Sequence, residues 1–254
     1  MSQTSSEKRL TILDRINNRI SLQTRLVLSM LFIALVPLIA VSTRNITQTQ
    51  QALTNGAEIS LRASALQTAN SLDTFIEETL ISLEIEAQFS DFSAYLALPP
   101  SERPGSLEQA NARDLLEQLS GKDTVNIISY ALVGADGRVL LDTVKENIQK
   151  NESGESYFSQ VRFSEKPIVT DVTYSDKTTT VIHFAGKVLS ADGEYAGILR
   201  VKYRSAVLQS VITESVGTST NTSVLLLDQL NIRMADTQNP ELILKSIVPL
   251  DFPS

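Results

Sequence analysis

The chain has 254 residues, 42% of them hydrophobic and 20% charged, with one histidine and no cysteine. This composition is typical of a globular protein with room for more than one compact unit. The absence of cysteine excludes disulfide bonds and thiolate zinc sites. The sequence also lacks a phosphate-binding glycine loop, a GxSxG or HExxH motif and a His-Asp-Ser set, so we expect neither catalysis nor a cofactor from these residues.

Charge is divided unevenly along the chain. Residues 1–25 hold five basic and two acidic side chains, a net charge of +3, whereas the remainder holds 17 basic and 27 acidic side chains, a net charge of −10. Binding to nucleic acid needs a clustered basic face. The acidic body therefore excludes nucleic acid as a partner.

Residues 26–43, LVLSMLFIALVPLIAVST, contain no charged side chain. Eighteen predominantly apolar, uncharged residues are just enough for a helix to cross the hydrocarbon core of a membrane. The basic arm at 1–25 precedes this segment, so the positive-inside rule predicts a cytoplasmic N-terminus, with everything after Thr43 outside. Pro37 is compatible with a transmembrane helix.

A cleaved signal peptide is the alternative interpretation, because Ala40-Val41-Ser42 is an acceptable cleavage site. A basic leader of 25 residues is long for a signal peptide, and the segment that follows continues the helical pattern. A buried soluble helix is disfavoured because no face of the apolar segment is polar.

A long helix is predicted over residues 44–98, which contain one glycine and no proline before Pro99. Its apolar residues recur every three or four positions, from Leu53 and Leu61 through Leu72 to Leu83 and Ala87. This stripe is explained by packing against the following domain or by a parallel homodimer stalk that carries motion to the membrane. Both explanations can apply, to different stretches of the helix.

The next segments predict a short helix and then a sheet. Ser106 and Gln109 resemble a capping box that opens a helix ending near Gly121. Strands are expected at 125–133, 139–141, 168–174, 179–189 and 195–203, with Asp136-Gly137 and Asp192-Gly193 in two of the turns. The sequence therefore predicts an α+β fold with a five-stranded antiparallel sheet and a connector at 143–167.

A repeat links two parts of the chain. Ala131–Thr143 and Val224–Thr237 both run from an apolar strand to Asp, turn, and return to Asp-Thr. This self-similarity predicts two copies of one module. Because 17 residues follow Thr237, we expect the second copy to be incomplete and the chain to be part of a longer receptor.

Several side chains of the predicted sheet are candidate ligand contacts. Tyr130 shares a strand face with Ile128 and Leu132, and points either into a pocket or into the core. Asp171 and Thr173 end the third strand, where they face a ligand or solvent. Two further candidates are His183, which is either a core residue or a pocket wall, and Lys202, which alternates with Arg200 and Arg204 and either holds an acidic ligand or faces solvent.

The order of these pieces resembles the double Cache family, the tandem PAS-like extracellular sensors of bacterial histidine kinases, chemoreceptors and cyclases. The resemblance covers about 44–254 and rests on the helix order, the Asp-Gly hairpin, Glu155-Ser156-Tyr157-Phe158 before Pro167–Val172, and Ala185–Val188 before Gly197–Leu199. It implies a stalk at 44–98, a PAS-like module at 99–215 and the beginning of a second at 216–254, which follow the basic arm at 1–25 and the transmembrane helix at 26–43 predicted from charge and hydropathy.

The resemblance also implies a small-ligand pocket between the sheet and the connector. Amino-acid-binding members carry an Arg-x-Trp-Tyr motif in the connector and an Asp at the end of the last strand. Gly154, Ser156 and Tyr157 stand at the motif positions here, and Lys202 stands near the strand end, so Tyr157 alone matches. A typical α-amino acid is therefore not the expected ligand.

These observations predict the extracytoplasmic input part of a receptor anchored in the bacterial inner membrane, with a small-molecule ligand, a homodimeric stalk and no metal. A secreted or anchored solute-binding protein is one alternative, which cleavage after Ser42 would favour. The other is an enzyme whose kinase or cyclase output lies beyond residue 254.

Overall fold

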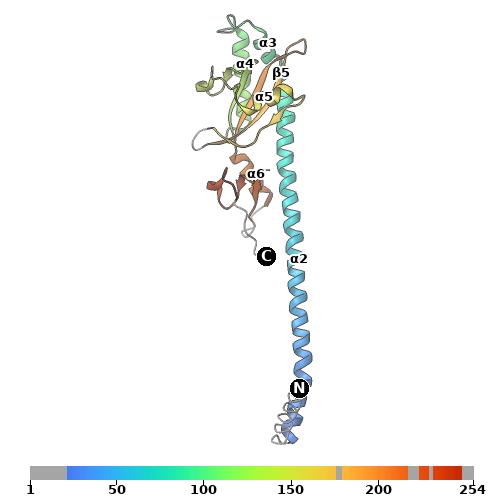
Figure 1. Cartoon of the computed structure of the whole chain (residues 1–254). Coiled ribbons are helices and arrows are strands. Elements are labelled where there is room, and N and C mark those ends of the chain that lie inside the picture. Colours follow the sequence, from blue (N-terminus) through green and yellow to red (C-terminus); the bar gives the residue numbers. More distant parts are fainter. Residues whose placement is uncertain (1–21, 176–178, 217–222, 229–230, 248–254) are drawn as a thin grey trace, which may run out of the picture. The chain divides into compact units, whose positions relative to one another are not determined.

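The computed structural model describes residues 22–175, 179–216, 223–228 and 231–247 (Figure 1). The chain divides into two units, residues 1–62 and 63–254, and the sheet with its packed helices belongs to the second unit. Most of the predicted basic arm, residues 1–21, lies outside the described residues.

Helix α2 (Leu22–Glu86) is 65 residues long and includes Pro37. It continues without interruption past the predicted membrane boundary at Arg44. In the described part of the chain, however, no helix is found to be both long and apolar enough to cross a membrane. The span predicted at 26–43 is therefore not confirmed, and the side chains of its residues Ala40 and Thr43 lie outside the described part.

The single helix predicted over 44–98 is two helices in the structure, because α2 ends at Glu86 and α3 (Ser90–Ala97) follows. The backbone N–H of Phe89 donates to Glu86 O at 3.1 Å, a tight three-residue turn without proline or glycine. Beyond the turn, Phe92 and Tyr95 are buried. Ala87 and Phe92 are five residues apart, which does not fit the spacing of three or four residues between apolar positions of one helix face. The change of direction after Glu86 lets both α2 and α3 bury their apolar faces.

Helix α4 (Leu107–Ser120) begins as the sequence predicts. The Ser106 hydroxyl accepts a hydrogen bond from Gln109 N at 3.0 Å, and Gln109 Oε1 in turn accepts from Gly105 N at 2.8 Å. Two backbone N–H groups that the helix leaves unpaired are thus satisfied by side chains. Gly121 caps the other end, and the short 3-10 helix η1 (Gly121–Asp123) leads to the sheet.

The sheet has six antiparallel strands, in the order β2-β1-β6-β5-β3 with β4 also paired to β5. Its strands are β1 (Ile127–Gly134), β2 (Val139–Asp142), β3 (Ile168–Val169), β4 (Thr173–Tyr174), β5 (Thr180–Leu189) and β6 (Tyr195–Arg204). The strand predicted at 168–174 is two short strands. Between them, His183 N donates to the Thr170 hydroxyl, which takes the place of a backbone acceptor in the ladder.

Two turns follow the predicted Asp-Gly chemistry. Gly137 and Gly193 have φ angles of 85° and 81°, which favour glycine. At Gly137 a Cβ atom would also lie 2.5 Å from the Cβ of Ser153, so the close approach of the connector to this hairpin requires glycine.

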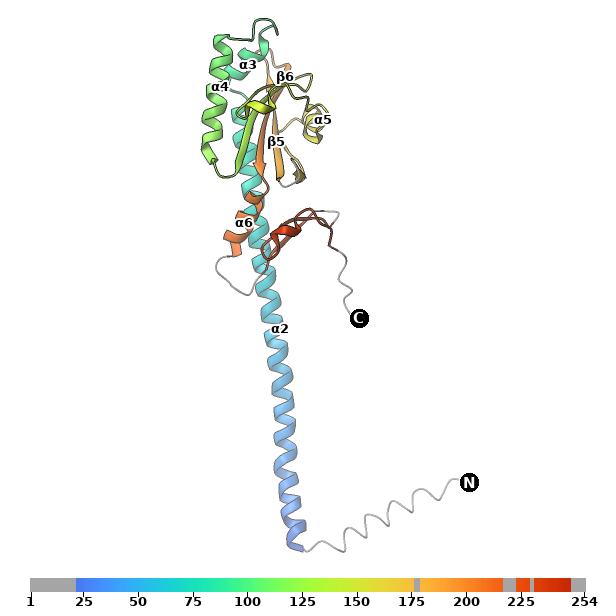
Figure 2. The same ribbon diagram turned by 90° about the vertical axis from the view of Figure 1, so that its left-hand side faces the viewer.

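Each face of the sheet has its own apolar core. One core joins β-strand residues such as Leu132 and Phe184 to Leu83 of α2, Phe92 of α3 and Leu116 of α4. The other core joins residues such as Ala131 and Ile198 to α5 (Ser156–Phe163), which belongs to the predicted connector. Figure 2 shows α4 and α5 on opposite sides of the sheet.

The predicted repeat is present in three dimensions. Hairpin β7 (Leu225–Leu227) and β8 (Arg233–Asp236) has a register shift at the same place as β1 and β2. In the first copy Tyr130 N donates to the Thr143 hydroxyl at 3.1 Å, and in the second Val224 N donates to the Thr237 hydroxyl at 2.9 Å. A short 3-10 helix follows each hairpin, η2 (Lys145–Asn147) and η3 (Pro240–Leu242). Helix α6 (Ala206–Val216) separates the two copies along the chain.

The apolar stripe of α2 changes its environment along the helix. Leu83 is 1% exposed and Leu72 is 6% exposed, whereas Leu53 and Leu61 are more than half exposed. The part of the stripe from Leu72 onward therefore packs against the domain, which is one of the two explanations offered by the sequence.

We expect Leu83→Ala to lower the free energy of unfolding by about 2–5 kcal/mol, because it removes a buried side chain and leaves a cavity. Ile85→Ala, two residues further along α2, is the matched control, and its expected effect is within about 0.5 kcal/mol because Ile85 is 57% exposed. Urea unfolding followed by circular dichroism measures both. Equal effects of the two changes would contradict the packing of Leu83 against the domain.

Candidate functional site

A cavity of about 220 Å³ lies between the connector and the sheet. The connector contributes the segment 147–155, and strands β4, β5 and β6 contribute the opposite wall. We call it the connector cavity; its lining residues are Asn147, Lys150, Asn151, Glu152, Glu155, Thr173, Tyr174, Ser175, His183 and Lys202.

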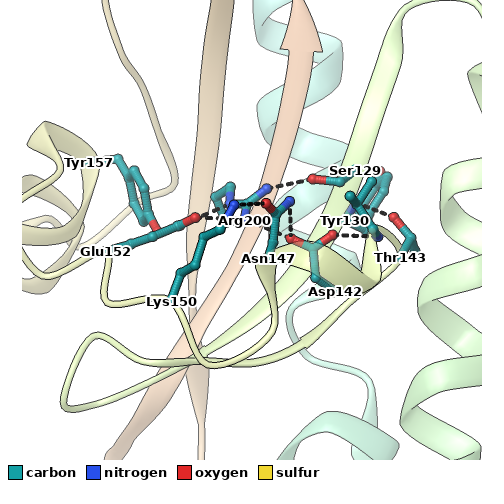
Figure 3. A network of polar contacts seen from close by, with 10 residues as sticks. Ser129, Tyr130, Asp142, Thr143, Asn147, Lys150, Glu152, Tyr157 and Arg200 are labelled. Atoms are coloured by element: carbon teal, nitrogen blue, oxygen red, sulfur yellow. Dashed lines mark hydrogen bonds and ion pairs between the residues drawn. The ribbon is translucent and has the colours of Figure 1, made fainter. Parts of the chain in front are cut away.

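Beside this cavity, Arg200 of β6 is completely buried and held by three elements (Figure 3). Its Nη1 donates to Ser129 Oγ of β1 at 2.7 Å, and its Nη2 donates to Asp142 Oδ2 at the end of β2 at 3.0 Å. Nη2 and Nε also donate to the two carboxylate oxygens of Glu152 in the connector, at 3.1 and 3.3 Å. The buried cation thus joins the middle of the sheet to the connector.

The network balances its charges internally. Burial by itself would lower the pKa of Arg200, but the Glu152 and Asp142 carboxylates raise it overall. Burial would likewise raise the pKa of Glu152, but Arg200 and the Tyr157 hydroxyl lower it overall. Arg200 and Glu152 are therefore ionised at neutral pH, and removing one partner would leave a buried charge uncompensated.

Tyr157 of α5 connects this network to the cavity wall. Its hydroxyl donates to Glu152 Oε2, and its ring lies beside the His183 ring with centroids 5.4 Å apart and an interplanar angle of 32°. Burial, opposed by the charge of Arg200, raises the pKa of Tyr157. The tyrosine is therefore a neutral hydrogen-bond donor that fixes the Glu152 carboxylate.

His183 of β5 is 7% exposed. Burial and the positive charges of Arg200 and Lys202 lower its pKa to about 3. Its imidazole is therefore neutral at physiological pH, with one nitrogen able to donate and the other able to accept a hydrogen bond.

Lys202 of β6 is the cation that faces the cavity without a direct partner. Its Nζ forms no hydrogen bond or ion pair with any residue in the described ranges, whereas Lys150 Nζ donates to Asn147 Oδ1 at 2.8 Å. Burial, with the charge of Arg200, lowers the pKa of Lys202. A half-buried ammonium group beside a cavity is well placed to bind an anionic group.

Four of the six side chains proposed from the sequence meet here. Thr173, His183 and Lys202 line the connector cavity, and Tyr157 contacts both His183 and the lining residue Glu152. Asp171 is exposed and does not line the cavity.

Tyr130 lies on the opposite face of the sheet and does not line the connector cavity; it lines a separate cavity of about 260 Å³ between α2 and the sheet. Neighbouring residues of a strand point to opposite faces, and Ser129 is the β1 residue that reaches the Arg200 network. The Tyr130 hydroxyl instead donates to Glu86 Oε2 at 3.1 Å. Glu86 is the last residue of α2, is 2% exposed, and also accepts from Lys122 Nζ at 2.6 Å and Ser82 Oγ at 2.8 Å.

Arg200, Asp142 and Glu152 were not predicted from the sequence as a cluster. Asp142 belongs to the Asp-Thr end of the repeat, where Asp236 is equally buried in the second copy, so the repeat is the signal that singles it out. Glu152 and Arg200 are separated by 48 residues, and no sequence pattern joins them.

The comparisons with known proteins support a shared fold. No family model and no curated protein matches the chain. Among solved structures, it resembles the sensor domain of the V. cholerae histidine kinase DctB, with a TM-score of 0.60 and 14% identity over 79% of this chain and 72% of that one. It also resembles the ligand-binding domain of the Campylobacter jejuni chemoreceptor Tlp3 in complex with L-valine, with a TM-score of 0.52 and 16% identity over 73% of each chain.

An extracellular ligand-binding receptor from Desulfohalobium retbaense matches with a TM-score of 0.55 and 15% identity over 72% of this chain. The chain spans about a third of that receptor, 32% of its length. At these identities the likeness is one of fold, and it confirms the resemblance to double Cache sensor domains at that level.

The single histidine allows a direct test of the cavity's electrostatics. The pKa of His183 is about 3 in the folded chain and about 6.5 when unfolded, so the unfolded state binds more protons between these values and stability falls as pH decreases through this range. Between pH 7.5 and 5.0 we expect the wild type to lose about 2 kcal/mol more than His183→Gln. Urea unfolding at both pH values measures this difference, and identical pH dependence of the two proteins would contradict it.

Proposed function

We propose that this chain, which shares the fold of double Cache sensor domains, is the extracytoplasmic ligand-sensing part of a transmembrane receptor. The observation that carries the proposal is the Lys202 ammonium, which is half-buried beside the connector cavity and has no direct partner among the residues that the structure describes. Structural lysines are normally solvated or paired, and a cation kept at a cavity wall favours an anionic ligand.

The chemistry of the lining indicates a small carboxylate-bearing ligand. Lys202 and Lys150 supply positive charge, which exceeds the negative charge of the exposed Glu155 because Glu152 is paired with Arg200, and Thr173 and neutral His183 supply hydrogen bonds. A cavity of about 220 Å³ suits a molecule of few atoms. The expectation that a typical α-amino acid is not the ligand stays a prediction, because Gly154 and Ser156 offer no cation at the positions where amino-acid-binding members carry one.

The chain also has a feature suited to an anchor. Twelve large apolar side chains between Leu26 and Val41 are more than 40% exposed on α2, with no charged residue among them. Water disfavours such a helix surface and lipid favours it. We infer that residues 26–43 anchor the chain in the inner membrane, with the N-terminus in the cytoplasm.

A route from the cavity to α2 passes through β1. Ser129 contacts Arg200 on the cavity face, and the adjacent Tyr130 contacts Glu86 on the helix face. A ligand that moves Lys202 or Glu152 changes the position of Arg200, and β1 transmits the change to the end of α2. The ligand thus favours one of two arrangements by its different affinity for each.

Dimerisation would bring two such helices together. Leu53, Ile59 and Leu61 are each more than half exposed on α2 before the part that packs on the sheet. We infer a homodimer through this stretch. Leu72, part of the same stripe, is buried in the core of its own domain and is not available for the contact.

The ligand site is tested by a thermal-shift screen of the purified chain in detergent against organic acids, amino acids, amines and purines. A ligand that binds only the folded state raises its stability, by about 2.7 kcal/mol at a hundredfold excess over Kd. We expect an organic acid to bind, and Lys202→Gln to weaken its affinity about tenfold or more through loss of a charge-assisted hydrogen bond. Arg204→Gln, an exposed change on the same strand, is the control and should bind normally.

Hydrogen exchange of the segment 83–89 gives a second readout of the same experiment. Ligand should alter exchange there in the wild type, and Tyr130→Phe should reduce this change while leaving the ligand's affinity nearly unaltered. If no ligand binds the folded chain, or if Lys202→Gln and Arg204→Gln bind equally, the connector cavity is not the sensor site.

The dimer contact is tested by sedimentation of the chain in detergent. Glu at both Leu53 and Leu61 places four carboxylates in the proposed contact, and we expect it to shift the chain from dimer to monomer. Gln51→Glu together with Asn55→Glu adds the same charge at exposed polar positions on the side of the helix away from Leu53 and should leave the dimer intact. A wild type that is monomeric at all concentrations would contradict the stalk interpretation.

A further inference from the structure

We propose that a second cavity, separate from the connector cavity, is a binding site for a small polyanion such as a tricarboxylate or a phosphate compound. It lies among α3, the loop before α4, α4 itself and the β1–β2 turn, and has a volume of about 490 Å³. We call it the arginine cavity, because Arg103, Arg113 and Arg138 all line it. Its size is within the range of small-molecule sites and more than twice that of the connector cavity.

Arg103 is held in place by neutral groups only. Its Nε donates to Leu98 O and its Nη2 to Leu96 O, both at 2.9 Å, and its guanidinium lies 5.7 Å from the centre of the Tyr95 ring. No acidic side chain in the described residues forms an ion pair with it. A half-buried guanidinium is thus fixed at the cavity wall with its charge uncompensated.

The other two arginines are available to a ligand. Arg113 of α4 is exposed and forms no ion pair within the described ranges. Arg138 lies 3.6 Å from Asp136, but both side chains are about 60% exposed, and exposed pairs of this kind contribute little. The lining therefore presents three guanidinium groups against the single carboxylate of Asp136.

Tyr95 adds a neutral donor to this cationic wall. Burial raises its pKa, and the charges of Arg103 and Arg113, which line the same cavity, oppose that rise less strongly. The hydroxyl therefore keeps its proton at neutral pH and can donate it to a bound oxygen.

This concentration of positive charge is unusual for the chain, whose net charge is −7. Like charges held around one cavity repel each other, and a bound anion removes that repulsion. Guanidinium groups bind carboxylates and phosphates through paired hydrogen bonds, which gives geometric specificity as well as attraction. A concave site also favours a small molecule over the flat surface of a protein partner.

The test uses the purified full chain in detergent and two probes, citrate and inorganic phosphate, titrated by calorimetry at constant ionic strength. We expect saturable binding of at least one probe, and the stronger probe identifies the ligand as a carboxylate or a phosphate. Arg113→Gln should weaken binding about tenfold, Arg113→Lys should weaken it less because it keeps the charge, and Arg138→Gln should add to the loss. Arg103 is left unchanged because its carbonyl contacts support the fold.

Two control variants distinguish this site from its alternatives. Lys202→Gln should bind the probes as the wild type does, and so should Arg204→Gln, which removes one exposed positive charge elsewhere. Loss of binding in Lys202→Gln with normal binding in Arg113→Gln would place the anion in the connector cavity and overturn the proposal. Saturation by neither probe would also overturn it.

Discussion

The interaction on which the domain depends is the burial of Arg200 between Asp142 and Glu152. A completely buried guanidinium is tolerated only if its charge and its donors are satisfied, and here Ser129 and two carboxylates do so. The three partners come from β1, from the end of β2 and from the connector. Detaching the connector from the sheet would therefore leave the buried charge of Arg200 without the Glu152 carboxylate. The Arg200 network thus holds the connector in place beside the connector cavity.

The positive and negative charges of the Arg200 network balance one another, whereas Lys202, which lines the adjacent cavity, takes no part in that network. Glu152 and Asp142 are committed to Arg200, so they do not neutralise Lys202 directly. The same positive charges, together with burial, keep His183 neutral. An anion entering the connector cavity would thus meet an unpaired ammonium group and a neutral imidazole, and its charge would raise the pKa of His183. Binding of an acid and protonation of this histidine are expected to favour each other.

The opposite face of the sheet contains a second costly arrangement at Glu86. A carboxylate at the C-terminal end of a helix is unfavourably placed in the helix dipole, and burial adds a desolvation cost. Lys122, Tyr130 and Ser82 offset these costs with three hydrogen bonds. Positions where a residue is locally unfavourable, as a buried carboxylate is at the end of a helix, are commonly functional. This one lies where the long helix meets β1, the strand that also contacts Arg200 on the other face of the sheet.

Interactions between residues that are close together in the sequence were sufficient to predict much of the fold. The Ser106 cap, the glycines at 137 and 193, the strands and the repeated Asp-Thr hairpin all depend on residues close together in the chain, and the structure contains them. The break after Glu86 and the face to which Tyr130 points were decided by tertiary packing. Arg200 shows the reason. Its alternation with Lys202 and Arg204 is the pattern of a strand face exposed to solvent. It is buried because the connector covers that face and supplies the carboxylate of Glu152, which is 48 residues away in the sequence.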